Sequence, residues 1–326
     1  MTYFLGFEVA RSVTGIHLSQ CKYTLDLLKD TGMLDSAPVS TPMHVSKHKV
    51  VENTDILPDP TPYRRLIGRL IYLTHTQPDI TYVVHFLSQF VAAPTSQHHQ
   101  ASIRILRYLK NAPGQGIFLQ ATGDLQFKAF NDSDWASCST TRRSVTGYVI
   151  YLGQSPISWK SKKQPTVSRS SSEAEYRALA STTCELQWLI HLMHDLQIQV
   201  SQPSLLYCDN QSAIQIASNQ VFHERTKHIE IDCHIVREKV QQKLIKLLPI
   251  NTHLQQADIL TKALPTPTFR FLCSKLGMLN IYSQLEGDSQ NIKSKETDGA
   301  TSNNTPSANM TVTAFTNNQQ CTLFLS

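Results

Sequence analysis

Four acidic residues stand at positions where folding could bring their carboxylates together. Asp132 follows the apolar run LQFKAF and Asp209 follows LLY, so each lies at the end of a predicted strand. Glu175 lies at the start of a predicted helix, and Asp258 lies near the start of the last one. Ligands gather at the carboxyl edge of open α/β sheets, and two divalent cations need hard oxygen ligands from several elements. The set therefore suggests a metal-dependent phosphodiesterase.

Each of these acids also has a structural explanation when it is taken alone. RSSSEAEY offers Ser172 as a helix N-cap, with Glu175 three residues later as its capping-box partner. Asp258, in LQQADILTK, would complement the dipole of the closing helix. No single acid specifies a site, and the chemistry is indicated only by the set.

The second half of the chain has the pattern of a layered domain that would carry these acids. Apolar strands are expected at 126–131, 145–152 and 155–160, followed by one long helix over 171–196. The short strand LLYCD, further helices, another strand and a closing helix come next. This order predicts an α/β or α+β layer sandwich.

The first half has a mostly helical pattern. Strand-like pieces at 3–10 and 16–19 precede the helical pattern KYTLDLLKDTG, and the proline-rich stretch 38–62 cannot be a helix. The remaining expected helices cover 63–74, 79–91 and 97–110.

Turn-forming residues in NAPGQGIFLQATGD mark a boundary near residue 123. The last part of the chain is rich in Ser, Thr, Asn and Gln and has no apolar periodicity until its final few positions. We therefore expect one domain over 1–122, a second over 123–282 and a disordered tail over 283–326.

Composition excludes several classes of protein. The 326 residues are 40% hydrophobic, and their apolar runs are far shorter than the roughly 18 residues of a membrane span. The N-terminal segment MTYFLGFEVARS lacks the basic and apolar regions of a signal peptide, so the cytoplasm or nucleus is expected, with no membrane partner. Seven cysteines form no C-x-x-C pair, which predicts free thiols.

The charge balance favours a polyanionic partner. The net charge of the chain is +5, and the predicted tail holds two lysines and four acidic residues. Residues 1–282 therefore carry 28 basic and 21 acidic groups. A positive excess of this kind is typical of proteins that bind nucleic acid.

Three other patterns give weaker signals. Trp135, Trp159 and Trp188 lie on different predicted elements, which favours core packing over a platform for stacked bases. The DTG at 30–32 matches the aspartic-protease triplet, but it ends a helical pattern and does not lie in a β-loop. An aspartic protease is therefore disfavoured. The YCDN at 207–210 has Asn in place of the second acid of a polymerase Y-x-D-D motif.

Three long stretches of the second half share one family resemblance. They are NDSDWASCSTTRRSVTGYVIYLGQSPISWKSKKQPTVSRSSSEAEYRALAS, LYCDNQSAIQIASNQVFHERTKHIEIDCHIVREKV and QQADILTKALP. Together they closely resemble the ribonuclease H domain of Copia-type LTR retrotransposon Pol polyproteins, over roughly residues 123–282. Upstream, YFLGFEVARSVTGIHLSQCKYTLDLLKDTGMLDSAPVSTPM and PYRRLIGRLIYLTHTQPDITYVVHFLSQF resemble the reverse transcriptase thumb and connection segments of the same polyproteins.

The resemblance implies an α/β fold of ribonuclease H type, a mixed five-stranded sheet with flanking helices. A smaller, mostly helical α+β remnant of a reverse transcriptase is expected to precede it. In the family, the polymerase active site of the palm would lie before residue 1. The chain is therefore expected not to be an active DNA polymerase by itself.

The resemblance also places the family's four metal-binding acids on Asp132 in NDSDW, Glu175 in EAEY, Asp209 in YCDN and Asp258 in ADILTK. Asp134 is the alternative in NDSDW, and Asp132 is chosen because the family's first ligand lies within the strand end. In EAEY, Glu173 is the alternative to Glu175. Capping geometry and motif register both favour Glu175.

The implied reaction is hydrolysis of the RNA strand of an RNA·DNA hybrid with two Mg²⁺ ions, for which Mn²⁺ can substitute. The ions would activate a bound water and stabilise the leaving 3′ oxygen, giving a 5′-phosphate and a 3′-hydroxyl. Four clustered carboxylates repel one another without metal, so cation binding would also order the site. The expected partners are the hybrid and other segments of the Pol polyprotein.

Hybrid binding is expected to depend on shape, phosphates and the 2′-hydroxyl rather than on base sequence. The candidates for backbone contacts are Lys160, Lys162, Lys163 and Arg169. For any one of them, a solvated basic loop is an equal alternative. His253, five residues before Asp258, is a candidate auxiliary proton carrier for product release.

A rival from a different class is a non-catalytic, nucleic-acid-binding relic of a retrotransposon. The complete set of four acids favours the enzyme. The expected lack of a polymerase centre and the tail without a counterpart in the family favour the relic.

Overall fold

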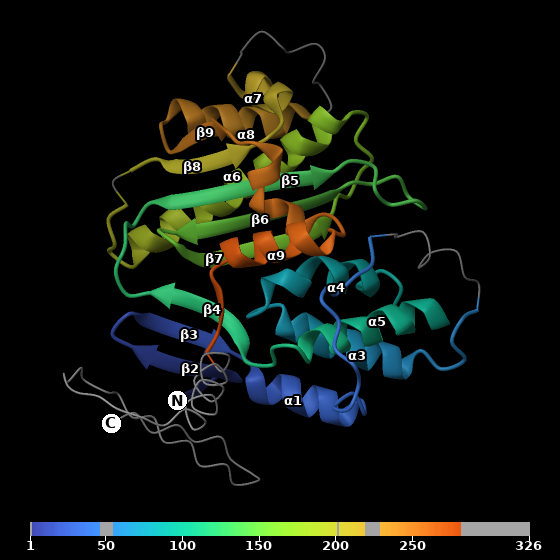
Figure 1. Ribbon diagram of the computed structural model, residues 1–326. Coiled ribbons are helices and arrows are strands. Elements are labelled where there is room, and N and C mark those ends of the chain that lie inside the picture. Colours follow the sequence, from blue (N-terminus) through green and yellow to red (C-terminus); the bar gives the residue numbers. More distant parts are fainter. Residues whose placement is uncertain (1, 46–54, 201, 219–228, 282–326) are drawn as a thin grey trace, which may run out of the picture.

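Two five-stranded β-sheets organise the chain in the computed structural model, which describes residues 2–45, 55–200, 202–218 and 229–281 (Figure 1). The first sheet has the order β1-β2-β3-β4-β10, and every neighbouring pair is antiparallel. Its strands are β1 (Thr2–Phe4), β2 (Phe7–Ser12), β3 (Gly15–Ser19), β4 (Gln115–Gln120) and β10 (Met278–Asn280). The tail predicted at 283–326 lies outside the described residues.

Strand β10 ties the C-terminal part of the described chain to the N-terminal sheet. Leu279 pairs with Gly116 across β10 and β4, and the His17 Nε2 atom lies 2.9 Å from the Leu279 carbonyl oxygen. A Cβ atom at Gly116 would lie 2.1 Å from the Leu18 carbonyl oxygen, so only glycine lets β3 and β4 approach this closely. The predicted boundary near residue 123 falls between β4 and β5, and the division into domains there stays a prediction.

The helices of the first half pack around one apolar cluster. They are α1 (Cys21–Asp30), α3 (Thr61–Leu73), the 3₁₀ helix η1 (Pro78–Ile80), α4 (Thr81–Ser88) and α5 (Ser96–Leu109). Leu66, Leu70 and Leu73 of α3 recur at helical spacing and are buried together with Leu28 and Leu106. These elements confirm the predicted smaller, mostly helical α+β unit.

The second sheet has the order β7-β6-β5-β8-β9 and is mixed. Strand β6 runs antiparallel to its two neighbours β5 and β7, whereas β8 is parallel to both β5 and β9. The strands are β5 (Phe127–Asp134), β6 (Val145–Leu152), β7 (Ser155–Lys163), β8 (Ser204–Cys208) and β9 (Ile245–Pro249). The observed β5 and β7 each continue three residues beyond the strands predicted from the apolar pattern.

Helices cover both faces of this sheet, as Figure 1 shows. Ala129 of β5 packs into a cluster with the long helix α6 (Ser171–Asp195), α7 (Gln211–Ser218) and α8 (Glu230–Gln241). The next residue, Phe130, points the other way, into a cluster with the 3₁₀ helix η4 (Gln256–Leu260) and α9 (Thr266–Lys275). The structure confirms the predicted α/β class, with a mixed five-stranded sheet and flanking helices.

Two local predictions about the helices were wrong. Helix α6 is capped by Ser170, whose side chain accepts the Glu173 backbone N–H, and not by Ser172. Glu175 therefore lies in the second turn and is no capping-box partner. Asp258 lies in η4 and not near the start of the closing helix, because the chain forms a separate 3₁₀ turn before α9 begins at Thr266.

In the part of the chain that the structure describes, every helix is too short or too polar to cross a membrane.

Candidate active site

Two of the predicted acids lie side by side at the carboxyl edge of the second sheet. The parallel register pairs Phe130 of β5 with Tyr207 of β8. Asp132 and Asp209 each come two residues later, so the register brings both to the same edge. The two carboxylates are close enough for Asp209 to contribute to a raised pKa at Asp132, after the larger effect of burial.

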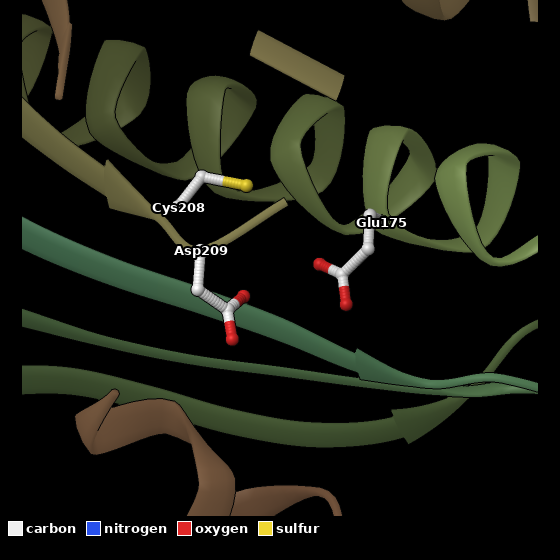
Figure 2. Close-up of side chains that lie close together, drawn as sticks. All are labelled: Glu175, Cys208 and Asp209. Atoms are coloured by element: carbon white, nitrogen blue, oxygen red, sulfur yellow. The ribbon is translucent and has the colours of Figure 1, made fainter. Parts of the chain in front are cut away.

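Helix α6 supplies the third acid. The Glu175 Oε1 atom accepts a hydrogen bond of 3.1 Å from the Ser133 backbone N–H, which ties α6 to the end of β5. Figure 2 shows the Glu175 carboxylate directed from α6 toward the end of β8, where Asp209 lies. The other oxygen, Oε2, is buried and has no hydrogen-bond partner among the described residues. A buried carboxylate oxygen in this state needs a cation or a water as its partner.

The fourth acid approaches from the opposite face of the sheet. Asp258 in η4 meets Asp132 through Lys262, whose Nζ atom lies 2.9 Å from Asp258 Oδ1 and 3.5 Å from Asp132 Oδ2. The Thr261 hydroxyl also donates to Asp132 Oδ2. The structure therefore brings all four predicted acids into one network around the end of β5.

Gly147 lets η4 approach the sheet this closely. It pairs with Asp132 across β6 and β5. A Cβ atom at this position would lie 2.6 Å from Thr261 Cγ2 and 2.9 Å from Leu260 Cβ. Any side chain there would push η4, and Asp258 with it, away from Asp132.

The acids carry more negative charge than the protein itself balances. Burial, followed by the charges of Asp132 and Asp209, raises the pKa of Glu175 well above its ordinary value. Burial and the charge of Asp132 raise the pKa of Asp258 to about 7, although Lys262 opposes this. The pKa of Lys262 is itself raised, because the attraction of Asp132 and Asp258 outweighs burial. Such a set is stabilised when a divalent cation binds.

The donor chemistry of the site fits a hard divalent metal ion. Carboxylate oxygens converge from β5, from the residue after β8, from α6 and from η4. One of them, Glu175 Oε2, is buried without a partner among the described residues. Oxygen ligands from several elements are what Mg²⁺ and Mn²⁺ select.

The site contains residues that the sequence did not single out. Lys262 and Thr261 follow Asp258 in ADILTK, and the i, i+4 spacing of Asp258 and Lys262 was the available signal. Cys208 precedes Asp209, and ligand atoms of Glu175, Cys208 and Asp209 all lie within 4.8 Å of one another. Burial, followed by the nearby Glu175 charge, raises the pKa of the Cys208 thiol to about 12.

Three of the predicted basic residues lie on β7, the edge strand of the sheet. Through β6, Lys162 and Lys163 are aligned with Ser133 and Asp134 of β5. The two lysines therefore lie level with the end of β5 that carries the acids. The Lys160 Nζ atom lies over the Tyr148 ring, 5.8 Å from the ring centroid. Together these lysines line a cleft of about 760 Å³ between β7 and helices α3 and α4.

The four basic candidates differ in how freely they can contact a ligand. The Lys163 Nζ atom lies 2.9 Å from Gln89 Oε1 and 2.9 Å from Cys138 Sγ, so it is partly engaged within the protein. Lys162 is exposed. Arg169 is exposed before α6, and its backbone N–H donates to the Glu173 carboxylate.

His253 lies in the 3₁₀ helix η3 (Thr252–Leu254) and is exposed. Its backbone N–H donates to Asn251 Oδ1 at 3.0 Å. No hydrogen bond or ion pair of the described residues joins its ring to the four acids, so the auxiliary role stays a prediction.

The tryptophan prediction was wrong for two residues. Trp135 and Trp188 are 48% and 57% exposed, and only Trp159 lies between elements, with its Nε1–H donating to the Thr74 carbonyl oxygen. Trp135 follows Asp134 at the end of β5, and its Nε1–H donates to the Ser168 carbonyl oxygen. The ring is therefore held in place beside the acidic edge with half of its surface in solvent.

Comparison with curated proteins shows extensive similarity to transposon proteins. The chain is 47% identical over 279 residues to "Retrovirus-related Pol polyprotein from transposon RE2" of Arabidopsis thaliana, covering 86% of this chain and 19% of that protein. It is 35% identical over 281 residues to "Retrovirus-related Pol polyprotein from transposon TNT 1-94" of Nicotiana tabacum, covering 83% and 21%. No protein-family model matches the chain.

Solved structures with a similar fold include LC11-RNase H1 in complex with an RNA/DNA hybrid, with a TM-score of 0.33 and 16% identity over 42% of this chain and 94% of that one. The foamy viral protease-reverse transcriptase dRH in complex with double-stranded DNA has a TM-score of 0.41 and 13% identity over 76% of this chain and 37% of that one.

The mixed sheet in the order β7-β6-β5-β8-β9, with helices on both faces, has a ribonuclease H-like α/β fold. The chain belongs to the family of retrovirus-related Pol polyproteins from transposons. It spans about a fifth of the length of the curated relatives named above.

Proposed function

We propose that this chain is a metal-dependent ribonuclease H of a Copia-type Pol polyprotein, which hydrolyses the RNA strand of RNA·DNA hybrids. The observation that carries the proposal is the convergence of Asp132, Glu175, Asp209 and Asp258 from four elements at one edge of the sheet. Buried carboxylates with raised pKa values, as at Asp132, Glu175 and Asp258, are typical of functional sites, because stability alone would not select them.

Asp132, Glu175, Asp209 and Asp258 would hold the metal ions through their carboxylate oxygens. Two Mg²⁺ ions held there would supply the Lewis acidity that activates a water for attack on the phosphodiester and would stabilise the charge on the leaving 3′ oxygen. Mn²⁺ fits the same oxygen donors.

Neighbouring groups position these carboxylates before any ligand binds. The Ser133 backbone N–H fixes Glu175 Oε1 and leaves Oε2 directed at the site. Thr261 and Lys262 hold Asp132 from the side of η4. Preorganised ligands of this kind lower the cost of assembling the site when the substrate arrives.

The lysines of β7 support binding of a nucleic-acid duplex. Adjacent strands lie roughly 5 Å apart, so the two steps from β5 across β6 to β7 place Lys162 about 10 Å from the acidic strand end. Lysines at this distance can hold the phosphate backbone while the acids act on one strand. We assign the same backbone contact to Lys160, Lys163 and Arg169, and we keep His253 as the proton carrier for product release.

The reaction is tested with the full chain and a hybrid whose RNA and DNA strands carry different labels. Cleavage of the RNA strand only, giving 5′-phosphate and 3′-hydroxyl ends and requiring added Mg²⁺, supports the proposal. Cleavage of the DNA strand, or cleavage that persists in EDTA, contradicts it. Tight hybrid binding without any cleavage by folded protein favours the non-catalytic relic.

A further inference from the structure

A thiol lies beside the carboxylates of the proposed active site. Cys208 is the last residue of β8, is fully buried and precedes Asp209. Ligand atoms of Cys208, Asp209 and Glu175 all lie within 4.8 Å of one another. Figure 2 shows the three side chains grouped between the end of β8 and helix α6. The Cys208 Sγ atom lies 3.8 Å from the Asn210 carbonyl oxygen, and the Asn131 side chain also interacts with the thiol. Hydrogen bonds of a thiol are weak, so the sulfur is available to a stronger ligand.

A second observation points to a ligand at the same place. Asn131 precedes Asp132 in β5, and the register that pairs Phe130 with Tyr207 brings it beside Cys208. Asn131 is fully buried, yet neither its Oδ1 nor its Nδ2 has a hydrogen-bond partner of normal geometry among the described residues. Glu175 Oε2 is in the same state. A buried polar atom of this kind destabilises the fold unless something binds it.

The sulfur ligand determines which metal ions can bind beside Cys208. Mg²⁺ takes oxygen ligands, whereas Zn²⁺ and Cd²⁺ bind thiolates together with carboxylates. Ligands of one tetrahedral Zn²⁺ lie roughly 3.6 Å apart, given Zn–S and Zn–O bonds of about 2.3 and 2.1 Å. Movements of the side-chain ligand atoms on the order of 1 Å would therefore let Glu175, Cys208 and Asp209 bind one ion together.

We propose that Glu175, Cys208 and Asp209, with Asn131 Oδ1 as a fourth donor, form a thiolate-containing site for a soft divalent cation, Zn²⁺ or Cd²⁺. On binding, the S–H bond of Cys208 breaks, its proton leaves to solvent, and a metal–sulfur bond forms without any change of oxidation state. The ion takes Glu175 and Asp209 away from the Mg²⁺ site. Zinc binding therefore inhibits hydrolysis, an effect that rests on the proposed function.

The site is tested first by spectroscopy, which does not depend on hydrolysis. Co²⁺ is the probe because Zn²⁺ is spectroscopically silent, while a cobalt-bound thiolate gives a charge-transfer band in the near ultraviolet. Metal-free full-length protein should gain this band on addition of one equivalent of Co²⁺ and lose it on addition of Zn²⁺. Absence of the band from folded protein overturns the proposal.

Matched cysteine variants identify the sulfur. Cys208→Ser should lose the band and bind Zn²⁺ at least about tenfold more weakly by calorimetry. Cys184→Ser, which alters an exposed cysteine of α6, should keep both. Cys208→Ala serves the same purpose if the serine variant does not fold, and circular dichroism checks both. A band that survives in a folded Cys208 variant overturns the assignment.

Inhibition is measured separately, as the ratio of hybrid cleavage with and without Zn²⁺ at fixed Mg²⁺. The zinc concentration for half inhibition should rise at least about tenfold in Cys208→Ser relative to Cys184→Ser. An equal concentration in both contradicts the inhibitory role. If the cobalt band is present but no variant cleaves hybrid, the proposed function fails while the metal site stands.

Discussion

The Lys262 ammonium nitrogen lies 2.9 Å from Asp258 Oδ1, four residues earlier in the chain, and places a positive charge among the buried acids. A second carboxylate, that of Asp132, lies 3.5 Å away. In the protein without metal, Lys262 therefore partly replaces the charge that a divalent cation would supply. Metal binding and this lysine are expected to be coupled.

Replacing Lys262 with Met should destabilise the protein without metal and increase its response to Mg²⁺. The loss is expected to be about 1 kcal/mol in EDTA, because a third of the side chain is exposed and the acids can take up protons instead. Thermal unfolding in EDTA and in Mg²⁺ gives the comparison. Lys246→Met, at an exposed position of β9, is the control. An equal Mg²⁺ effect on the melting temperature of both variants would count against the coupling.

Gly147→Ala should displace η4 and weaken the site. The new Cβ would lie 2.6 Å from Thr261 Cγ2 and 2.9 Å from Leu260 Cβ, so the expected loss is about 1–3 kcal/mol of unfolding free energy. Urea denaturation measures it. Gly68→Ala, in the open interior of α3, should instead stabilise the protein by roughly 0.5–1 kcal/mol. A neutral Gly147 variant would show that η4 does not depend on this close contact.

Much of the fold and part of the site could be predicted because they depend on local patterns. The apolar runs of β5 and β6 and the long helix α6 were visible in the sequence, and the strand ends pointed to Asp132 and Asp209. The pairing of β10 with β4 joins segments about 160 residues apart, which no local pattern encodes. The N-cap of α6 was misplaced by two residues because three consecutive serines all satisfy the capping preference.

Exposure was the least predictable property of the site. Trp135 was expected in the core because the three tryptophans lie on different predicted elements, but its hydrogen bond to Ser168 holds it beside the acidic end of β5. Lys262 was missed because a lysine near a predicted helix start usually extends into solvent. Only the approach of η4 to β5 decides that it faces Asp132.

Asp79 should make stability depend on pH. It is buried, its pKa is raised by burial to about 6, and the Tyr108 hydroxyl that donates to it only partly opposes the shift. The folded protein therefore binds this proton more tightly than the unfolded chain, and the stabilisation from it is lost as pH rises from about 4 through about 6. The change is roughly 3 kcal/mol for a shift of about two pH units.

Asp79→Asn isolates this effect because an amide oxygen can still accept from Tyr108 without titrating. The unfolding free energy of the wild type minus that of Asp79→Asn should decrease between pH 4 and pH 7, as measured by urea denaturation. Parallel pH profiles for the two proteins would contradict the assignment.

Trp135→Ala should weaken binding of the hybrid. The ring is half exposed and lies next to the acidic edge, and a base or sugar stacked on it would contribute about 1–3 kcal/mol. Fluorescence anisotropy with labelled hybrid measures the dissociation constant. Trp188→Ala is the control, since position 188 lies about 20 Å along α6 from Glu175. An equal change of the dissociation constant in both variants would contradict a stacking role for Trp135.

The central claim is that the convergent carboxylates perform metal-dependent hydrolysis of RNA in a hybrid. The most direct measurement compares initial rates of RNA-strand cleavage by full-length Asp132→Asn, Asp209→Asn and the exposed-acid control Asp124→Asn, at several Mg²⁺ concentrations. We predict a loss of at least about a hundredfold for the first two at every Mg²⁺ concentration, with folded protein and wild-type rates in the control. Wild-type rates in folded Asp132→Asn and Asp209→Asn would contradict it.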